Sequence, residues 1–305
     1  MTHLAFRAAA VFVSIGLSSL ARAQAPVCAN PGALGTSRVV SVGTAGGLAV
    51  GLKTYPQTLA LKDHELVLTF DDGPWPVTTP AVLAALEAEC VRATFFLIGR
   101  NALAAPALVR QEIAAGHTVA HHTFSHPSVT LRGLSSEKAR AEIEQGFEAV
   151  DTAAYGAAGT GPRVPFFRFP GFADTLPLLR WLDSRNIAVF GADIWASDWE
   201  MMTPQEELTK LMYRIEKAGH GIVLLHDVKA QSAAMLPSFL LELKKHGYSI
   251  VHIEPGPGPA LTELASDSWT SQTDRSLARM GYVEHPEGVA PVAPAPKTPP
   301  FRGPR

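Results

Sequence analysis

The sequence predicts an α/β fold in which parallel strands and helices alternate around a closed or nearly closed barrel. Short apolar runs alternate with longer segments of helical spacing from Leu66 to Ile253, without a visible linker. The apolar runs are nearly continuous, which is typical of strands buried on both faces of a parallel sheet. About seven such units favour one (β/α) barrel. A doubly wound open sheet is the competing architecture.

The elements follow one another through a single predicted domain at 64–254. The predicted strands are Leu66–Phe70, Ala93–Ile98, Thr118–Ala120, Pro165–Phe169, Ala188–Ala192, Gly221–Leu225 and Ser249–Ile253. The predicted helices are Pro80–Glu89, Ala104–Ala115, Ser136–Val150, Leu176–Ser184, Pro204–Ala218 and Ala230–Lys245. Thr203 is the expected N-cap of the fifth helix, with Pro204 at its first position.

The N-terminal residues have the pattern of an export signal. Arg7 precedes an apolar stretch, Ala8–Leu20, and Ala21-Arg22-Ala23 forms an A-x-A cleavage site. The stretch is shorter than the roughly 18 residues of a membrane span, so an uncleaved anchor is the weaker alternative. We expect a signal peptide at 1–23, an exported protein in the periplasm or outside the cell, and no stable membrane insertion after cleavage.

The segments that flank the predicted domain lack clear periodicity. Residues 24–63 are rich in Gly and Thr and are expected to form an irregular arm. Residues 255–305 are rich in proline, which supplies no backbone N–H donor and disrupts helix interiors. We expect a disordered tail there, with one short helix near Leu261–Ser266. Cys28 and Cys90 are the only cysteines, and export would allow a disulfide between them. Two free buried thiols are the alternative.

The composition excludes some classes of protein and leaves others open. The chain has 305 residues, 47% of them hydrophobic, and a formal net charge of −2. These values are ordinary for a globular protein. No basic region indicates binding to nucleic acid, and no acidic block indicates a disordered acidic tail. The oligomeric state is unknown from the sequence.

Polar clusters follow the ends of several predicted strands. They are Asp71-Asp72, His121–His126, Arg168–Gly171, Asp193 with Asp198-Trp199, and His226-Asp227. In parallel α/β folds the carboxyl ends of the strands form one face, and sites are built there. Each cluster alone is weak evidence, because Asp, Gly and Pro are also ordinary turn residues. Their coincidence predicts one active site.

Two of these clusters predict a metal site. Successive side chains of a strand point to opposite faces, so one of Asp71 and Asp72 could hold a cation while the other faces a reacting molecule. His122 and His126 are spaced i, i+4, which in a helical turn places both imidazoles on one face. A carboxylate with two imidazoles is a common ligand set for zinc or another divalent ion, and it leaves a position for water. A helix cap is the alternative for either histidine.

The other clusters offer candidates for acid–base chemistry. Asp198 could hold the His226 imidazolium and keep its pKa high enough for proton donation. Arg168 could favour the ionised form of Asp71 and fix its direction. A buried ion pair without a catalytic role is the alternative for both pairs.

These motifs resemble those of the NodB-type polysaccharide deacetylases, carbohydrate esterase family 4, over residues 64–254. The motifs occur in the family's order at Thr69–Pro74, His122–His126, Arg168–Gly171, Asp193–Trp199 and Ile222–Asp227. The first two are highly specific, and the last three match mainly by their order. The resemblance implies a distorted barrel of about seven parallel strands and a divalent metal, most often zinc, with cobalt or another ion as the alternative.

The resemblance also implies a role for each candidate residue. Asp71 matches the general base, His226 the general acid, Arg168 the residue that orients the base, and Asp198 the residue that tunes the acid. The implied metal ligands are Asp72, His122 and His126.

The residues implied to contact the substrate are Gly171, Trp199 and Leu224. Trp199 and Leu224 match side chains that line a pocket for the acetyl methyl group. The family commonly carries Tyr at the position of Gly171, and Phe169 replaces a frequent Pro. The backbone N–H of Gly171 can still donate to an oxyanion. The departure therefore concerns sugar contacts more than chemistry.

The sequence thus predicts an exported, metal-dependent hydrolase that removes N-acetyl groups from a glycan containing N-acetylglucosamine, either a chitin oligosaccharide or peptidoglycan. An O-deacetylase acting on xylan or another esterified glycan is the alternative within enzymes, because the same site can attack an ester. A glycan-binding protein without turnover is the alternative from another class. It is the weakest, because every expected catalytic position is filled.

Overall fold

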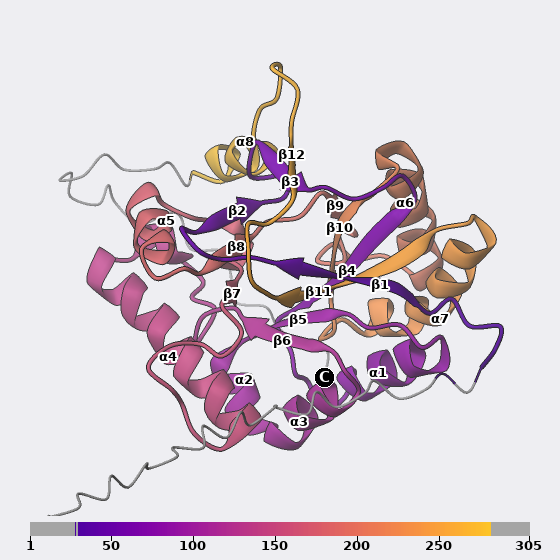
Figure 1. Cartoon of the computed structure of the whole chain (residues 1–305), viewed down its shortest axis with the longest axis horizontal. Coiled ribbons are helices and arrows are strands. Elements are labelled where there is room, and N and C mark those ends of the chain that lie inside the picture. Colours follow the sequence, from indigo (N-terminus) through magenta and orange to yellow (C-terminus); the bar gives the residue numbers. More distant parts are fainter. Residues whose placement is uncertain (1–27, 29, 282–305) are drawn as a thin grey trace, which may run out of the picture.

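The computed structural model describes residue 28 and residues 30–281 (Figure 1). The predicted signal peptide at 1–23 lies outside the described residues, as do residues 282–305 of the predicted tail. Within the described part of the chain, no helix combines the length and the apolar character needed to cross a membrane.

Parallel strands form the wall of a barrel. They are β4 (Glu65–Asp71), β5 (Thr94–Leu97), β6 (Thr118–His121), β7 (Phe166–Phe167), β8 (Ala188–Phe190), β9 (Ile194–Trp195) and β10 (Gly221–His226). Hydrogen bonds connect β4 through β5, β6 and β7 to β8, and β10 pairs with both β4 and β9. The chain passes directly from β8 to β9, so this bend completes the ring in place of a ladder between the two strands. The predicted parallel α/β fold is confirmed.

The barrel is distorted where β11 (Ser249–Pro255) joins it. β10 runs along one edge of β4 from Leu66 to Asp71. The other edge of β4 is shared, because β11 pairs with its first residues and β5 pairs with Thr69–Asp71. β11 therefore leaves the barrel after a short contact with β4.

Residues 24–63 do not form the predicted irregular arm; that prediction is wrong for the described residues. β1 (Thr36–Val42) pairs with β11, and β2 (Leu48–Val50) pairs with β8, both in parallel. β3 (Gln57–Leu59) pairs antiparallel with β12 (Thr262–Leu264). These strands are short or half-exposed, and their partners lie far away in the sequence. Local periodicity was therefore a poor guide to them.

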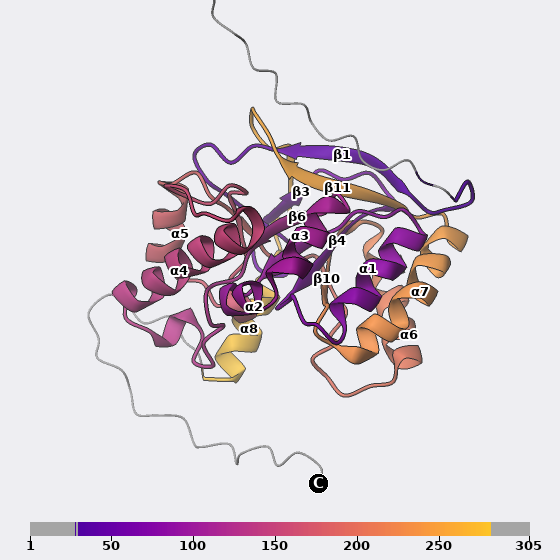
Figure 2. The same cartoon turned by 90° about the horizontal axis from the view of Figure 1, so that it is seen from below.

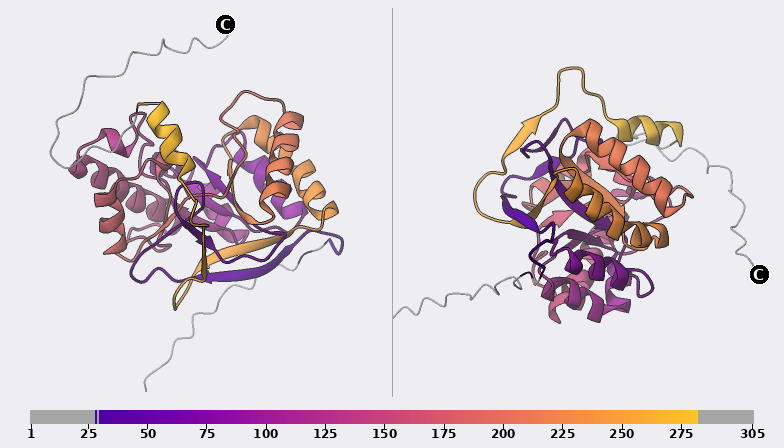
Figure 3. Two further views of the ribbon diagram at one scale, coloured as in Figure 1. Left: turned by 90° about the horizontal axis from the view of Figure 1, so that it is seen from above. Right: turned by 90° about the vertical axis from the view of Figure 1, so that its right-hand side faces the viewer.

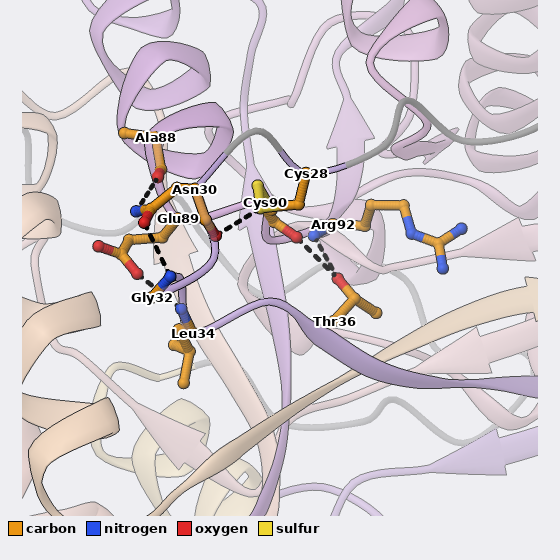
Figure 4. Close-up of a disulfide and its surroundings, with 9 residues drawn as sticks. All are labelled: Cys28, Asn30, Gly32, Leu34, Thr36, Ala88, Glu89, Cys90 and Arg92. Atoms are coloured by element: carbon orange, nitrogen blue, oxygen red, sulfur yellow. Dashed lines mark hydrogen bonds between the residues drawn. A yellow bond between two sulfur atoms is a disulfide. The ribbon is translucent and has the colours of Figure 1, made fainter.

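The start of this segment is fixed to helix α1 (Thr79–Ala88) (Figure 4). A disulfide joins Cys28 to Cys90 and closes a loop between residues 62 apart in sequence. In the chain-entropy model, closure of such a loop stabilises the fold by about 4 kcal/mol. The backbone N–H of Leu34 also donates to Glu89 Oε2 at 2.7 Å, and Asn30 Nδ2 donates to the Ala88 carbonyl at 3.3 Å.

The predicted tail is ordered over residues 255–281, which contradicts the sequence-based expectation for that part. The predicted helix near Leu261–Ser266 is instead strand β12, which finds a partner in β3. A helix follows later, α8 (Gln272–Arg279), where the Ser271 side chain caps the first turn by accepting from the Asp274 N–H at 3.0 Å. No proline lies between Pro259 and Pro286, so the proline density of the tail does not apply to α8.

Helices cover the outside of the barrel (Figures 1 and 2). They are α1, α2 (Gly99–Ala104), α3 (Pro106–Ala114), α4 (Ser136–Tyr155), α5 (Leu176–Asp183), α6 (Pro204–Ala218) and α7 (Ala230–Lys245). α2, α3 and α4 lie on one side of the barrel, and α1, α6 and α7 lie together on another. As predicted, Thr203 caps α6, in a capping box with Glu206.

The strands sort their side chains between two cores. Leu66, Leu68 and Phe70 of β4 pack in the cluster shared with the outer helices, whereas Val67 packs inside the barrel. Because side chains alternate along a strand, Thr69 and Asp71 point inward with Val67. In β10 the same alternation places Ile222 inside with Leu224 and His226, and Val223 outside.

Candidate active site

Asp71 ends β4 at the mouth of the barrel and is held by a buried arginine. Arg168 is fully buried, and its Nη1 donates to Asp71 Oδ1 at 2.7 Å and to Thr69 Oγ1 at 2.8 Å. The Thr69 hydroxyl donates its one proton to the Val223 carbonyl at 2.6 Å, so it must accept from Arg168. Arg168 Nε donates to the Phe190 carbonyl, and Nη2 donates to the Gly191 carbonyl. These contacts hold Arg168 in place, so it fixes the direction of the Asp71 carboxylate.

The pKa of Asp71 reflects two opposed effects. Burial raises it above its ordinary value, while the charges of Arg168 and His226 act in the opposite direction. The second oxygen, Oδ2, lies 3.8 Å from His122 Nε2 and does not bond to Arg168. One oxygen of Asp71 is therefore anchored and the other faces the site, which suits a general base.

Asp72, His122 and His126 converge beside Asp71. Asp72 Oδ1 lies 3.6 Å from Nε2 of each histidine, and one ligand atom from each residue lies within 4.8 Å of the others. Asp72 has a left-handed backbone, with φ of 77°. This turn directs its side chain away from Arg168 and towards the two imidazoles.

The donor set fits a divalent cation. His122 Nδ1 donates to the Arg168 carbonyl at 2.7 Å, so the lone pair is on Nε2, which faces Asp72. Anchoring one ring nitrogen on a carbonyl is the usual way in which a protein orients a metal-binding histidine. Asp72 Oδ1 is buried without a hydrogen-bond partner among the described residues. A buried carboxylate oxygen facing the Nε2 atoms of two imidazoles is what a zinc-type ion would satisfy.

The local conformation of the histidine segment differs from the helical turn considered from its spacing. Residues 122–126 are not helical, and Thr123 and His126 have positive φ values of 65° and 50°. The His126 N–H donates to Thr123 Oγ1 at 3.1 Å, which closes a tight turn. The turn brings both rings to one side, with centroids 5.2 Å apart. The prediction that the two imidazoles lie on one side is confirmed, but the helical turn considered for it is wrong.

His226 ends β10 next to Asp71 and is held by Asp198. Its Nδ1 donates to Asp198 Oδ1 at 2.7 Å, and its backbone N–H donates to Asp198 Oδ2 at 2.7 Å. Burial disfavours the imidazolium, but the charge and hydrogen bond of Asp198, together with the charges of Asp72 and Asp71, outweigh burial and raise the pKa of His226 to about 9. Nε2 is then the ring nitrogen left to donate a proton into the site.

Asp71, His122, His126 and His226 line one cavity of about 660 Å³. The predicted substrate residues Gly171, Trp199 and Leu224 all line it. Gly171 has φ of 59°, and a Cβ built there meets only Thr130 Cγ2, at 4.0 Å. Trp199 is 47% exposed and presents its ring edge-on to His226.

The cavity also has a wall that sequence reasoning missed. It is formed by Lys53, Phe172, Trp195, Arg214, the α8 residues Gln272, Thr273, Ser276, Leu277 and Arg279, and Met280 after this helix. In Figure 3, left, α8 in yellow stands across from α6 at this end of the molecule. A signal for α8 was present in Ser271-x-x-Asp274, a capping pattern followed by Leu277 four residues after Thr273. No comparable signal points to Lys53.

Comparisons with known proteins identify the family of this chain. The model of the polysaccharide deacetylase family matches residues 59–180. A chitooligosaccharide deacetylase of Azorhizobium caulinodans is 31% identical over 163 residues, which are 53% of this chain and 73% of that protein. This chain belongs to the polysaccharide deacetylase family. The peptidoglycan-N-acetylglucosamine deacetylase PgdA of Listeria monocytogenes is 29% identical over 203 residues, 64% of this chain and 39% of that protein.

A solved structure of the family shows a similar fold. The Bdellovibrio bacteriovorus peptidoglycan deacetylase Bd3279 superposes with a TM-score of 0.63 and 28% identity, covering 72% of this chain and 59% of that one. This polysaccharide deacetylase family member thus spans well under two thirds of the length of PgdA and of Bd3279. The residues that the family model matches, 59–180, include Asp71, Asp72, His122, His126 and Arg168.

Proposed function

We propose that this chain is a metal-dependent hydrolase that removes N-acetyl groups from a glycan containing N-acetylglucosamine. One observation carries the proposal: a metal-ligand set of Asp72, His122 and His126 lies beside an anchored carboxylate, Asp71, and the two histidines of this set line one cavity together with Asp71 and His226. The relatives named above are peptidoglycan and chitooligosaccharide deacetylases, which supports this substrate class.

The metal would be held by Asp72 and the Nε2 atoms of His122 and His126. A divalent ion, for which zinc is the best fit to one carboxylate and two imidazoles, supplies Lewis-acid polarisation of the carbonyl when bound.

The chain's own residues then account for the proton transfers. Asp71 Oδ2 takes a proton from the attacking water while Oδ1 stays on Arg168. The Gly171 N–H is available to the oxygen that gains negative charge. His226 Nε2 donates a proton to the amine nitrogen as the C–N bond breaks, and acetate leaves. Leu224 and Trp199 offer the apolar contacts for the methyl group.

Export is the second part of the proposal. The charged, apolar and A-x-A segments at 1–23 are the pattern of a secretory signal. The Cys28–Cys90 disulfide is the kind of bond that oxidising compartments sustain. A periplasmic or extracellular location also gives access to cell-wall glycans.

Acetate release tests the proposal. Mature protein loaded with zinc or cobalt is assayed on chitin oligomers and on peptidoglycan, beside Asp71→Asn and His226→Ala. His246→Ala, which changes a half-exposed histidine on the far end of α7, is the control. We expect activity in the wild type and the control and its loss in both site variants. Activity that survives both site changes would sink the assignment.

The same assay separates the two alternatives. Faster acetate release from acetylxylan than from every N-acetylated glycan would make the protein an O-deacetylase. Binding of chitin oligomers without any acetate release, at saturating zinc and at saturating cobalt, would make it a glycan-binding protein.

A further inference from the structure

The wall of the cavity away from the metal-ligand set carries an excess of positive charge. Lys53, Arg214 and Arg279 line it, and in the described structure none of them lies within ion-pair distance of a carboxylate. Glu200, the acidic residue of this wall, is already paired with Lys210 at 3.0 Å. On the catalytic side of the cavity the negative charges belong to Asp71 and Asp72, and they face the imidazoles of His122, His126 and His226.

Arg214 Nη1 donates to the Trp195 and Ala196 carbonyls at 2.6 and 3.1 Å, and Lys53 is also held in place. Lys53 is half-buried, and its Nζ donates to Gln272 Oε1 at 2.6 Å and lies 5.6 Å from the ring centre of Trp195. Burial lowers its pKa, and the neighbouring Arg214 charge lowers it further. A cation that is desolvated beside other cations gains from an anionic ligand.

The cationic wall is also a fixed surface. The Thr273 N–H donates to the Lys53 carbonyl at 2.9 Å, and Thr54 and Thr273 join their hydroxyls at 2.9 Å. Arg132 donates to Asp274 at 3.0 Å, and Trp269 Nε1 donates to the Leu52 carbonyl at 2.7 Å. Helix α8 is therefore anchored to the barrel and does not need to move to meet a substrate.

We propose that Lys53, Arg214 and Arg279 bind a carboxylate of the glycan, so that the preferred substrate is an acidic N-acetylated glycan and not a neutral oligomer. The inference rests on the proposed deacetylase function and narrows its substrate class. Peptidoglycan carries carboxylates on its sugars and peptides, whereas chitin oligomers carry none.

A matched pair of substrates tests this. One is a peptidoglycan tetrasaccharide with free carboxylates, and the other is the same molecule with those groups converted to methyl amides. We expect a kcat/KM about tenfold higher for the carboxylate form, as one charge-assisted contact would give. The preference should shrink with added salt. In Arg279→Gln and Lys53→Met the ratio should fall towards one.

The control is Arg275→Gln, which removes the same charge from the same helix at a residue outside the cavity lining. An equal loss of preference in Arg275→Gln and Arg279→Gln, or no preference in the wild type, would overturn the site. Binding of both tetrasaccharide forms to Asp71→Asn, measured by calorimetry, keeps the question separate from turnover. If the protein binds the carboxylate form more tightly but releases no acetate, the proposed function is refuted, whereas the carboxylate-binding role of the wall is retained.

A separate set of contacts behind His226 supports a second inference. Ser232 Oγ lies 2.9 Å from Asp198 Oδ2 and 2.8 Å from Glu207 Oε1. Glu207 is fully buried, and its Oε2 has no hydrogen-bond partner among the described residues. A hydroxyl has one proton and can donate to only one of two carboxylates. The His226 imidazolium requires Asp198 as an anion, so the Ser232 hydroxyl donates its proton to Asp198. Glu207 must therefore be protonated and donate its own proton to Ser232 Oγ.

We infer that Glu207 holds a proton and, through Ser232, positions Asp198 behind His226. Glu207 is a positioning residue, because it does not line the cavity. The charged groups that bear on it are Asp198 from the segment before α6 and His226 from β10, while α7 presents the neutral Ser232. Consistently, burial raises the pKa of Glu207 to about 7.

Glu207→Gln tests this inference, because it keeps a hydrogen-bond donor and removes the titration. The wild type should lose stability relative to this variant as the pH rises from about 5 to about 8, since the unfolded chain releases its Glu207 proton first. The alkaline limb of kcat should also move to lower pH, because ionised Glu207 no longer helps to hold the imidazolium. Glu216→Gln on the same helix is the control. A stability difference that does not change with pH, with an unmoved alkaline limb, would refute the inference.

Discussion

His226 and His252 lie on two strands that both pair with β4, and they have opposite acid–base properties. His226 ends β10, and His252 lies within β11, where it is 1% exposed. The pKa of His226 is raised to about 9, whereas burial, reinforced by Arg92 and His117, lowers that of His252 to about 3. Both rings are desolvated, so burial alone does not decide the sign.

The partner of each ring makes the difference. His226 donates to the Asp198 carboxylate at 2.7 Å. The ring of His252 meets Thr118 Oγ1 at 3.0 Å, and this hydroxyl already donates its proton to the Ile253 carbonyl. His252 Nε2 must therefore be the donor, and its other nitrogen is left without a partner in the described structure. A buried histidine is chemically active here only where a carboxylate and the cavity both reach it.

Loss of the bound metal should give the largest effect, because the carbonyl of the substrate is then no longer polarised. His122→Ala, or treatment of the wild type with a chelator, should reduce kcat/KM by on the order of 10³-fold, as loss of several kcal/mol of charge stabilisation implies. Metal content measured by plasma emission should fall in step, and zinc or cobalt should restore only the chelated wild type. Full activity in metal-free protein would contradict the assignment. His252→Leu should keep its metal.

His226→Ala removes the proton donor and leaves the metal ligands in place. We expect kcat to fall by about 10²–10⁴-fold on an N-acetylated glycan, the usual contribution of a general acid. Metal content should stay at the wild-type level. The loss should be smaller on an activated aryl acetate, whose leaving group needs no proton. An equal loss on both substrates would argue against the role of proton donor.

Asp198→Asn should make His226 resemble His252. The general acid works while it is protonated, so wild-type kcat should fall as the pH rises through about 9. Without the carboxylate the pKa of His226 falls, and this alkaline limb should move to lower pH. The pair should also stabilise the fold fully below pH 6.5, the ordinary value for histidine, and lose that contribution as the pH rises through about 9. Identical pH profiles for kcat in the two proteins would refute the coupling.

The sequence was informative about the site because the site is local at each strand end. Leu66–Phe70 and Ile222–Leu225 are apolar runs that a parallel sheet buries, and alternation along them fixes which polar residue faces the barrel. Asp71 and His226 could therefore be placed without knowing the loops. The turn that joins His122 to His126 was not predictable from spacing, because it depends on residues with positive φ at Thr123 and His126.

What the sequence concealed depends on distant partners. β1 pairs with β11, and β3 pairs with β12, more than 200 residues away in both cases, as the registers Val39↔His252 and Thr58↔Glu263 show. Such strands are short and need no strong pattern of their own, since an existing sheet supplies the donors and acceptors. The cationic wall has the same origin, because Lys53 and α8 meet only in the folded chain.

His252→Leu should have the smallest effect and tests the other side of the comparison. Thr118 keeps its bond to the Ile253 carbonyl, so the change removes one hydrogen bond and should cost about 1 kcal/mol of unfolding free energy near pH 8. In the unfolded chain His252 becomes protonated below about pH 6.5, whereas in the folded chain it stays neutral down to about pH 3. The wild type therefore loses stability as the pH is lowered through this range. The variant lacks this loss. Urea unfolding near pH 8 and near pH 5 should show the deficit shrinking or reversing, with kcat unchanged. A deficit that grows towards acid pH would mean that His252 is charged in the folded protein.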